Sequence, residues 1–582
     1  MKDERKDEGG RMKDEGKAFK AVKNSFHPSA FILHPCFSRG CASRLINFLL
    51  LVSLACGMVF PAGAQEQQPP PQQRERRVTS APTVAPPTVP DTPAASTATT
   101  ASAGAPRTVE ELRARIEEVL RRPELAPALV AVKVASLDSG RTLFEENAGK
   151  LLVPASNMKL YTVAAALDRL SPDFRFKTSV YASAPPDSSG TVRGDLVIYG
   201  RGDPTFAASL NGGDYFKAID VLAERIASSG LKRVEGDLVG DESYFTGAPQ
   251  GFGWEWADLT WYSGAEVSAL SVNDNALDLI VKPGPSVGSP CTITTGPTTP
   301  LVTITNRTTT SERRSKRDLT VYRGLGENVI EVSGSLPFDD PGWTAGVAVS
   351  RPALLFVYML RTALAARGVN IAGRSRTVDA HALTNALPAT ASLVEIARTE
   401  SQPLSVIAGL ALKPSQNLYT ELILRALGRA TASDSKLSSE DAGIEAVKAF
   451  LRSAGIDASE VVLTDGSGLS RRDMVTANAT LQLLTYMSRH RYGAAFREAL
   501  PIAGVDGTLK NRMRGTPAAG NVRAKTGTLT AVSSLSGYAT SAAGERLVFS
   551  IMLNNSPDGL LMLRNYLDTI AVLLASYKGS DK

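Results

Sequence analysis

The spacing of apolar positions predicts that ordered structure begins near residue 108. Residues 108 to 120 carry an apolar stripe with helical spacing, and Thr108 opens a capping box typical of a helix start. Apolar and polar residues alternate over 129 to 137, and after a turn at Asp138-Ser139-Gly140 the chain continues in extended form, which predicts a β-hairpin. Good helix formers over 160 to 167 then predict a buried helix.

A different pattern follows from about residue 177, where short β-rich runs alternate with Gly, Pro and Asp. We interpret residues 184 to 383 as an inserted β-rich region whose few helices include one around Tyr215 to Ser229. The runs expected to form strands are residues 195–199, 234–239, 301–306 and 328–333.

Helical periodicity returns after the insertion. It marks residues 394 to 398 and a helix from Ala411 through Ser415 that stops at Gly428. Strands are then predicted at residues 521–529, 534–539 and 546–553, and a closing amphipathic helix at 560–577. We expect the N-terminal hairpin and these strands to form one antiparallel sheet with helices on both faces, an α/β (α+β) fold interrupted by the insertion.

The residues before 108 predict export. The first 23 form a charged run, and an apolar stretch over 45 to 60 leads to the small-residue cleavage site Ala62-Gly63-Ala64. An uncleaved anchor remains open, as does a lipid anchor at Ser53-Leu54-Ala55-Cys56, although Ser53 occupies a position that is normally aliphatic. Residues 65 to 107, rich in Pro, Gln, Ala and Thr, predict an unstructured tether.

These patterns divide the chain into five expected segments. They are the N-terminal extension with its signal peptide (1–64), the linker (65–107), the first part of the sheet-and-helix domain (108–183), the inserted β-rich region (184–383) and the second part of the first domain (384–578).

Composition narrows the possible chemistry. The chain has 582 residues and a formal charge of +6, but removal of residues 1–64 leaves 54 basic and 52 acidic residues, so we expect no nucleic-acid partner. Only Cys291 would survive cleavage, which excludes an internal disulfide. The surviving histidines, His381 and His490, have no carboxylate or serine context, which argues against a Ser-His-Asp triad or a zinc site. No cofactor is expected.

Ser156 and Lys159 are the first candidates for chemistry. Residues three apart on a helix share a face, so Lys159 can reach the Ser156 hydroxyl, and a neutral lysine amine can deprotonate a serine nucleophile. The same spacing occurs at Ser229 with Lys232 and at Ser433 with Lys436, which we interpret as surface positions.

Two further motifs complete the set. In Ser415-Gln416-Asn417, the hydroxyl can relay a proton while the asparagine amide holds the lysine. Ser271-Val272-Asn273 matches equally well but lies in the insertion. On a predicted strand, Lys525 and Thr526 can bind a substrate carboxylate, and Gly527 lets a substrate backbone lie along the strand edge.

Two electrostatic effects are expected among these residues, one on the developing negative charge of the substrate and one on the pKa of Lys159. The backbone N–H groups of Ser156 and Thr528 are expected to form an oxyanion hole. The charge of Lys525, together with burial, is expected to lower the pKa of Lys159 toward the neutral form that a base requires.

The three motifs, in this order, resemble the signature of penicillin-binding proteins and serine β-lactamases. The long separation of Ser156 from Ser415 is similar to that in the class C low-molecular-mass penicillin-binding proteins, the D-alanyl-D-alanine carboxypeptidase/endopeptidase group. The resemblance covers about residues 108 to 578 and implies a β-lactamase/transpeptidase-like domain. Further local matches are Gly200–Pro204, Gly236–Asp241, Asp465–Ser470 and Gly504–Leu509.

This resemblance implies a reaction and its partners. Ser156 would be acylated by a peptidoglycan stem peptide and, covalently, by β-lactam inhibitors, in an exported periplasmic enzyme that touches a membrane at most through an uncleaved signal or lipid anchor. Asp258, in Trp256-Ala257-Asp258-Leu259-Thr260, occupies the position of an acidic residue that recognises the free amine of diaminopimelate.

Two alternative functions stay open. A serine β-lactamase must deacylate quickly and usually carries a positioned carboxylate, for which no convincing Glu motif lies between Ser156 and Ser415. A non-catalytic cell-wall-binding scaffold would have no need to retain all three motifs.

Overall fold

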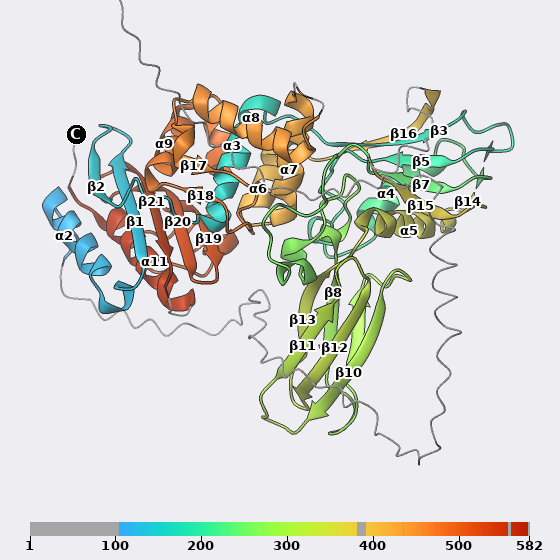
Figure 1. Cartoon of the computed structure of the whole chain (residues 1–582), viewed down its shortest axis with the longest axis horizontal. Helices are drawn as coiled ribbons and strands as arrows, with labels where there is room; N and C mark the ends of the chain where they lie inside the picture. Colours follow the sequence, from blue (N-terminus) through green and yellow to red (C-terminus); the bar gives the residue numbers. More distant parts are fainter. Residues whose placement is uncertain (1–103, 381–391, 433, 435, 557–559, 580–582) are drawn as a thin grey trace, which may run out of the picture. The chain divides into compact units, whose positions relative to one another are not determined.

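The computed structural model describes residues 104–380, 392–432, 434, 436–556 and 560–579 (Figure 1). Three predictions concern residues outside this part: the signal peptide with its two alternatives, nearly all of the tether, and the end of the insertion at residue 383. Among the described residues, no helix combines the length and apolar character needed to cross a bilayer. Half of the predicted capping box is present at the start of α2 (Val109–Leu120): Thr108 accepts a hydrogen bond from the Glu111 N–H at 3.2 Å, whereas the Glu111 carboxylate accepts from the Arg107 N–H at 2.7 Å rather than from the N–H of Thr108.

The two ends of the described chain meet in one five-stranded antiparallel sheet, as predicted (Figure 1). Strand β1 is central to this joining: it pairs with β21 along its whole length, from Leu129 opposite Asn554 to Ser136 opposite Leu547. In sheet order the strands are β19 (Arg523–Leu529), β20 (Val532–Thr540), β21 (Arg546–Asn554), β1 (Leu129–Ser136) and β2 (Thr142–Glu146).

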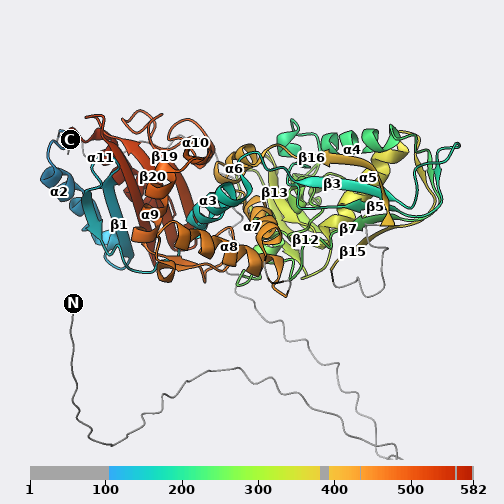
Figure 2. The same cartoon turned by 90° about the horizontal axis from the view of Figure 1, so that it is seen from above.

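Helices cover both faces of this sheet (Figure 2). Alternate residues of a strand point to opposite faces, and β1 follows this rule: Val132 and Val134 pack into the core beneath α2 and α11, while Ala131 and Ala135 pack into the core beneath α3 and α9. The predicted fold class is therefore confirmed. The covering helices are α2 (Val109–Leu120), α3 (Met158–Leu170), α9 (Ala477–Arg489) and α11 (Leu560–Ser576).

A layer of helices extends the core that lies beneath α3 and α9. Helices α3, α7 and α8 lie side by side (Figure 2). The layer comprises α6 (Leu404–Leu412), α7 (Asn417–Thr431), α8 (Ser439–Ser453) and α10 (Gly493–Glu498), with a small ribbon of β17 (Val461–Val462) and β18 (Met474–Val475) beside it.

The single helix predicted from Ala411 to Gly428 is wrong in two respects. The chain breaks between α6 and α7, because Pro414 has no N–H to continue the helical hydrogen bonds, Ser415 adopts a positive φ of 65° and Gln416 is extended. Gly428 does not end α7, which continues to Thr431. Its role is close packing, since a Cβ at residue 428 would lie 2.3 Å from the Ser439 carbonyl oxygen of α8.

The insertion contains the predicted helix, α4, and strands β5, β10 and β12 at three of the four predicted runs. The strand predicted at 234–239 is wrong, because this run is divided between β6 and β7, which belong to different sheets. The main sheet of the insertion is mixed, in the order β15-β7-β5-β3-β16, and α5 packs against β7 and β15 of this sheet. Two three-stranded sheets, β13-β8-β9 and β10-β12-β11, share an apolar cluster. A third three-stranded sheet has the order β14-β6-β4.

The bounds of these elements are β3 (Lys177–Ala182), β4 (Thr191–Val192), β5 (Leu196–Tyr199), α4 (Lys217–Ala227), β6 (Arg233–Val234), β7 (Leu238–Asp241), β8 (Ala276–Lys282), β9 (Thr292–Gly296), β10 (Thr303–Ser311), β11 (Asp318–Arg323), β12 (Val329–Pro337), β13 (Trp343–Ala348), α5 (Pro352–Ala365), β14 (Asn370–Ile371), β15 (Ser375–Val378) and β16 (Val394–Glu400).

The helix expected at residues 394 to 398 is also wrong. These residues belong to β16, which pairs antiparallel with β3. Five residues are too few to separate helical from extended periodicity, so pairing with a distant strand decides the conformation. Since β3 and β16 both lie outside residues 184 to 383, the main sheet of the insertion reaches beyond those expected limits.

Candidate active site

The sequence-predicted residues of the three motifs converge beside β19, the edge strand of the five-stranded antiparallel sheet. Ser156 lies in the 3₁₀ helix η2 (Ala155–Asn157), immediately before α3, and β19 packs against this turn. Ser415 occupies the break before α7, and Asn417 is the first residue of α7. Elements from both parts of the split domain are therefore needed to assemble one site.

Lys159 is the centre of the hydrogen-bond network. Its buried amine donates to Ser156 Oγ at 3.0 Å, to Asn417 Oδ1 at 2.6 Å and to the Ser467 carbonyl oxygen at 2.6 Å. The predicted approach of Lys159 to Ser156 is therefore present. Because these three acceptors surround the amine, its position relative to the Ser156 hydroxyl is fixed.

Burial lowers the pKa of Lys159 to about 8. The carboxyl groups of Asp465, Glu421 and Asp473 oppose this effect, since a nearby negative charge favours the protonated amine. A substantial neutral fraction at mildly alkaline pH follows, and a neutral amine can accept the proton of Ser156.

Lys525 is equally buried, and its amine donates to Ser415 Oγ at 2.9 Å and to the Thr526 carbonyl oxygen at 2.8 Å. Burial and then repulsion by Lys159 hold the pKa of Lys525 well below its usual value. Repulsion between the two buried amines disfavours protonation of both, while the carboxyl groups behind Lys159 favour its charged form.

Asn417 links the site to the insertion. While its Oδ1 accepts from Lys159, its Nδ2 donates to the carbonyl oxygen of Ser263 at 2.8 Å. Ser263 lies in the 3₁₀ helix η5 (Tyr262–Gly264), directly after η4 (Asp258–Thr260), which carries Asp258. Burial, and then repulsion by Glu255, raises the pKa of Asp258. The segment of Asp258 therefore borders the network.

The rival motif at Ser271 and Asn273 has a structural role. Asn273 Oδ1 accepts from the Ala208 N–H at 3.0 Å, and Asn273 Nδ2 donates to the Tyr215 carbonyl oxygen at 3.2 Å. Both partners lie in the insertion, so this asparagine holds turns of the insertion together.

Gly527 is required by the protein itself. A Cβ at residue 527 would lie 2.5 Å from the Pro154 carbonyl oxygen and 3.1 Å from the Ser156 backbone nitrogen, and closer still to Ser534 Oγ. This explanation differs from the predicted one, in which the glycine makes room for a substrate backbone. The absence of a side chain lets β19 approach the turn that carries Ser156.

Sequence reasoning gave no role to several residues that hold the site. Thr508 Oγ1 accepts from Thr526 Oγ1 at 2.8 Å, and Ser534 Oγ donates to the Pro154 carbonyl oxygen at 2.7 Å. Asp465 and Ser467 form part of the loop behind Lys159. The Gly-rich runs at 465–470 and 504–509 were the available signal, but their partners come from distant segments.

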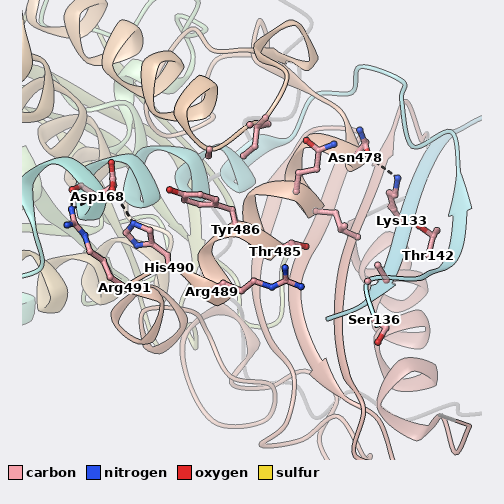
Figure 3. A pocket seen from close by; sticks show the side chains of 17 residues that line it. Lys133, Ser136, Thr142, Asp168, Asn478, Thr485, Tyr486, Arg489, His490 and Arg491 are labelled. Atoms are coloured by element: carbon pink, nitrogen blue, oxygen red, sulfur yellow. Dashed lines mark hydrogen bonds and ion pairs between the residues drawn. The ribbon is translucent and has the colours of Figure 1, made fainter. Parts of the chain in front are cut away.

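A large cavity lies elsewhere. It has a volume of about 930 Å³ and is lined by the β1–β2 hairpin, one face of α9 and the residues after α8 (Figure 3). Lys133 and Arg489 project into this region, while Asp168 contacts His490 at 3.1 Å (Figure 3). None of the sequence-predicted site residues lines this cavity, so its size does not identify the chemical site.

Comparison with known proteins agrees with this geometry. Residues 112–577 match the model of the D-Ala-D-Ala carboxypeptidase 3 (S13) family. The chain is 37% identical to a D-alanyl-D-alanine carboxypeptidase of Actinomadura sp. (strain R39) over 481 residues, which cover 81% of this chain and 85% of that protein.

Solved structures show the same fold. The crystal structure of penicillin binding protein 4 from Haemophilus influenzae superimposes with a TM-score of 0.69 at 24% identity, over 79% of this chain and 99% of that one. A complex of that protein with a β-lactam gives a TM-score of 0.62 at 23% identity, over 78% and 97% of the two chains.

Proposed function

This chain belongs to the D-Ala-D-Ala carboxypeptidase 3 (S13) family, and from this premise we propose that it is a serine-type D-Ala-D-Ala carboxypeptidase that acts on peptidoglycan stem peptides. The observation that carries the proposal is the buried Lys159 amine held 3.0 Å from Ser156 Oγ. A Ser-Lys pair of this kind performs acyl transfer without histidine.

In the proposed reaction, Ser156 Oγ attacks the carbonyl carbon of the penultimate D-alanine, and its proton passes to neutral Lys159. The negative oxygen of the tetrahedral intermediate accepts hydrogen bonds from the backbone N–H groups of Ser156 and Thr528. The C–N bond then breaks, and the terminal D-alanine leaves with a proton relayed through Ser415. Water hydrolyses the resulting ester and regenerates Ser156.

Substrate groups have candidate partners around this centre. Lys525 and the hydroxyls of Thr526 and Thr528 would bind the terminal carboxylate. Asp258 would bind the free amine of a diaminopimelate side chain, which would also permit endopeptidase cleavage of crosslinks. β-Lactams would acylate the same Ser156; the solved β-lactam complex of a protein with this fold supports this part.

The place of action follows from the substrate. Peptidoglycan lies outside the cytoplasmic membrane, and the apolar stretch at residues 45 to 60 would direct export to the periplasm. In this proposal the sheet-and-helix domain, residues 108–183 with 384–578, carries the catalytic machinery, and the inserted region contributes Asp258.

The test is a pair of assays on the same purified protein. We expect release of D-alanine from a stem pentapeptide ending in D-Ala-D-Ala, measured by chromatography, with slow or no turnover of benzylpenicillin. Rapid multiple turnover of benzylpenicillin with an intact pentapeptide would assign a β-lactamase. A protein that modifies neither substrate would be a scaffold.

The rate of acylation is expected to rise with pH up to about 8. Below the Lys159 pKa of about 8, each pH unit lowers the neutral fraction of this base tenfold, whereas above it the rate levels off. The second-order rate constant for acylation by benzylpenicillin at pH 6 should therefore be about 100-fold below the plateau. Stopped-flow or quenched mass measurements from pH 5.5 to 10 check this, with circular dichroism as the control for folding. A rise centred near pH 10.5, the value of an unperturbed lysine, contradicts it.

A further inference from the structure

A short segment of the insertion is fastened to the loop behind Lys159. Trp254 Nε1 donates to Asp465 Oδ2 at 2.8 Å, and Arg471 Nε contacts Glu255 Oε1 at 2.9 Å. Beside them, the guanidinium of Arg472 lies over the ring of Phe252, 4.7 Å from its centre. We call residues 251–255 the clamp segment and residues 465–470 the lysine loop.

Asp465 determines the shape of the lysine loop. Its carboxylate is fully buried, and it accepts hydrogen bonds from the backbone N–H groups of Ser467 at 3.1 Å, Gly468 at 2.6 Å and Ser470 at 2.8 Å. Two side chains also donate to its Oδ2, Ser467 Oγ at 3.4 Å from within the loop and Trp254 Nε1 at 2.8 Å from the insertion.

The lysine loop in turn holds the base. The Ser467 carbonyl oxygen accepts from Lys159 Nζ at 2.6 Å, and the Gly466 carbonyl oxygen accepts from Thr162 Oγ1, one turn further along α3, at 2.8 Å. A shift of the loop therefore moves an acceptor of the Lys159 amine. The chain of contacts runs from Trp254 through Asp465 and Ser467 to Lys159.

We propose that Trp254 is a positioning residue, which fixes Lys159 for acylation of Ser156 by donating its indole N–H to Asp465. This inference rests on the proposed function. It gives the insertion a second task besides peptide recognition, because a residue of the insertion would determine the reactivity of Ser156 toward every acylating substrate, including those too small to reach Asp258.

The charged groups around Lys159 define the expected signature. Asp465 and Asp473 face it from the segment between α8 and α9, Glu421 from α7, and Lys525 from β19. Loss of the indole N–H leaves more of the Asp465 charge uncompensated. The Lys159 amine then holds its proton to higher pH, so the pH profile of acylation should move upward.

The experiment compares Trp254→Phe with Phe252→Leu in the full chain. Trp254→Phe keeps an aromatic ring but removes the donor, and we expect acylation by benzylpenicillin about tenfold slower at pH 7, the scale of one hydrogen bond to a charged group, with the midpoint of the pH profile shifted upward. Phe252→Leu loosens the same clamp segment at Arg472 without touching Asp465, and should acylate at the wild-type rate with an unshifted profile. Thermal unfolding confirms that both variants fold.

The outcomes separate this inference from the proposed function. If wild-type protein is acylated and Trp254→Phe matches it in rate and pH profile, Trp254 is not a positioning residue. Equal slowing of both variants, or slowing without a shift in the profile, assigns the clamp segment a purely structural role and also overturns the inference. A wild-type protein that is never acylated overturns the proposed function, and the inference with it.

Discussion

Replacing Ser156 with alanine is expected to yield a folded protein that forms no adduct with benzylpenicillin, whereas the unaltered chain gains the mass of one penicillin. In a β-lactam the broken C–N bond is part of a ring, so no fragment leaves and the whole molecule stays on Ser156 Oγ. The substitution removes one of three acceptors of Lys159. Asn417 and Ser467 still accept from the amine, so the buried charge retains partners and the fold should persist.

Intact-mass spectrometry over time measures this result. Ser229→Ala is the matched control, because Ser229 precedes Lys232 with the same spacing but lies in the insertion. It should form the adduct as the wild type does. A persistent adduct indicates slow deacylation, as in a carboxypeptidase, while return of unmodified protein within seconds indicates a β-lactamase. An adduct on Ser156→Ala contradicts the assignment of the nucleophile.

The parts of the site that sequence could predict are those fixed by local geometry. Helical spacing places Lys159 one turn from Ser156, and the observed distance between their polar atoms is 3.0 Å. The hairpin and the three C-terminal strands were likewise predictable from alternation of apolar residues, since such patterns depend on near neighbours. We could also expect them to join in one sheet, as they do through β1 and β21, because a domain packs layers of secondary structure around one core.

The rest depends on contacts between distant segments. The partner of Ser415 is Lys525, 110 residues away, and this pairing requires the positive φ that Ser415 adopts after Pro414. Strand β16 forms because β3 offers it a free edge, which no local pattern of residues 394 to 400 reveals. The carboxyl groups of Glu421, Asp465 and Asp473 raise the pKa of Lys159 against the effect of burial, and only the assembled fold places them behind the amine.

Substitution of Gly527 by alanine is expected to reduce acylation at least about 100-fold, the scale of one lost oxyanion donor. The new Cβ would lie 2.5 Å from the Pro154 carbonyl oxygen, which is backbone and cannot rotate away, so β19 must move from the turn that carries Ser156. That movement separates the two proposed oxyanion donors, the N–H groups of Ser156 and Thr528. Overpacking should also lower the free energy of unfolding by about 1–3 kcal/mol. Rate constants for benzylpenicillin acylation and denaturant unfolding measure the two effects.

Two further variants show whether backbone contact is the cause. Gly149→Ala adds a Cβ where nothing lies within 4 Å, and should leave both acylation and stability unchanged. Adding Ser534→Ala to Gly527→Ala removes the side-chain part of the clash but leaves the Pro154 carbonyl oxygen in place, so only part of the lost stability should return and acylation should stay impaired. Full recovery of acylation in the double variant would mean that Ser534, rather than the approach of β19 to Pro154, was the obstacle. If Gly527→Ala is less stable but is acylated at the wild-type rate, the oxyanion donors do not depend on this contact. That result would contradict the roles proposed for Ser156 and Thr528.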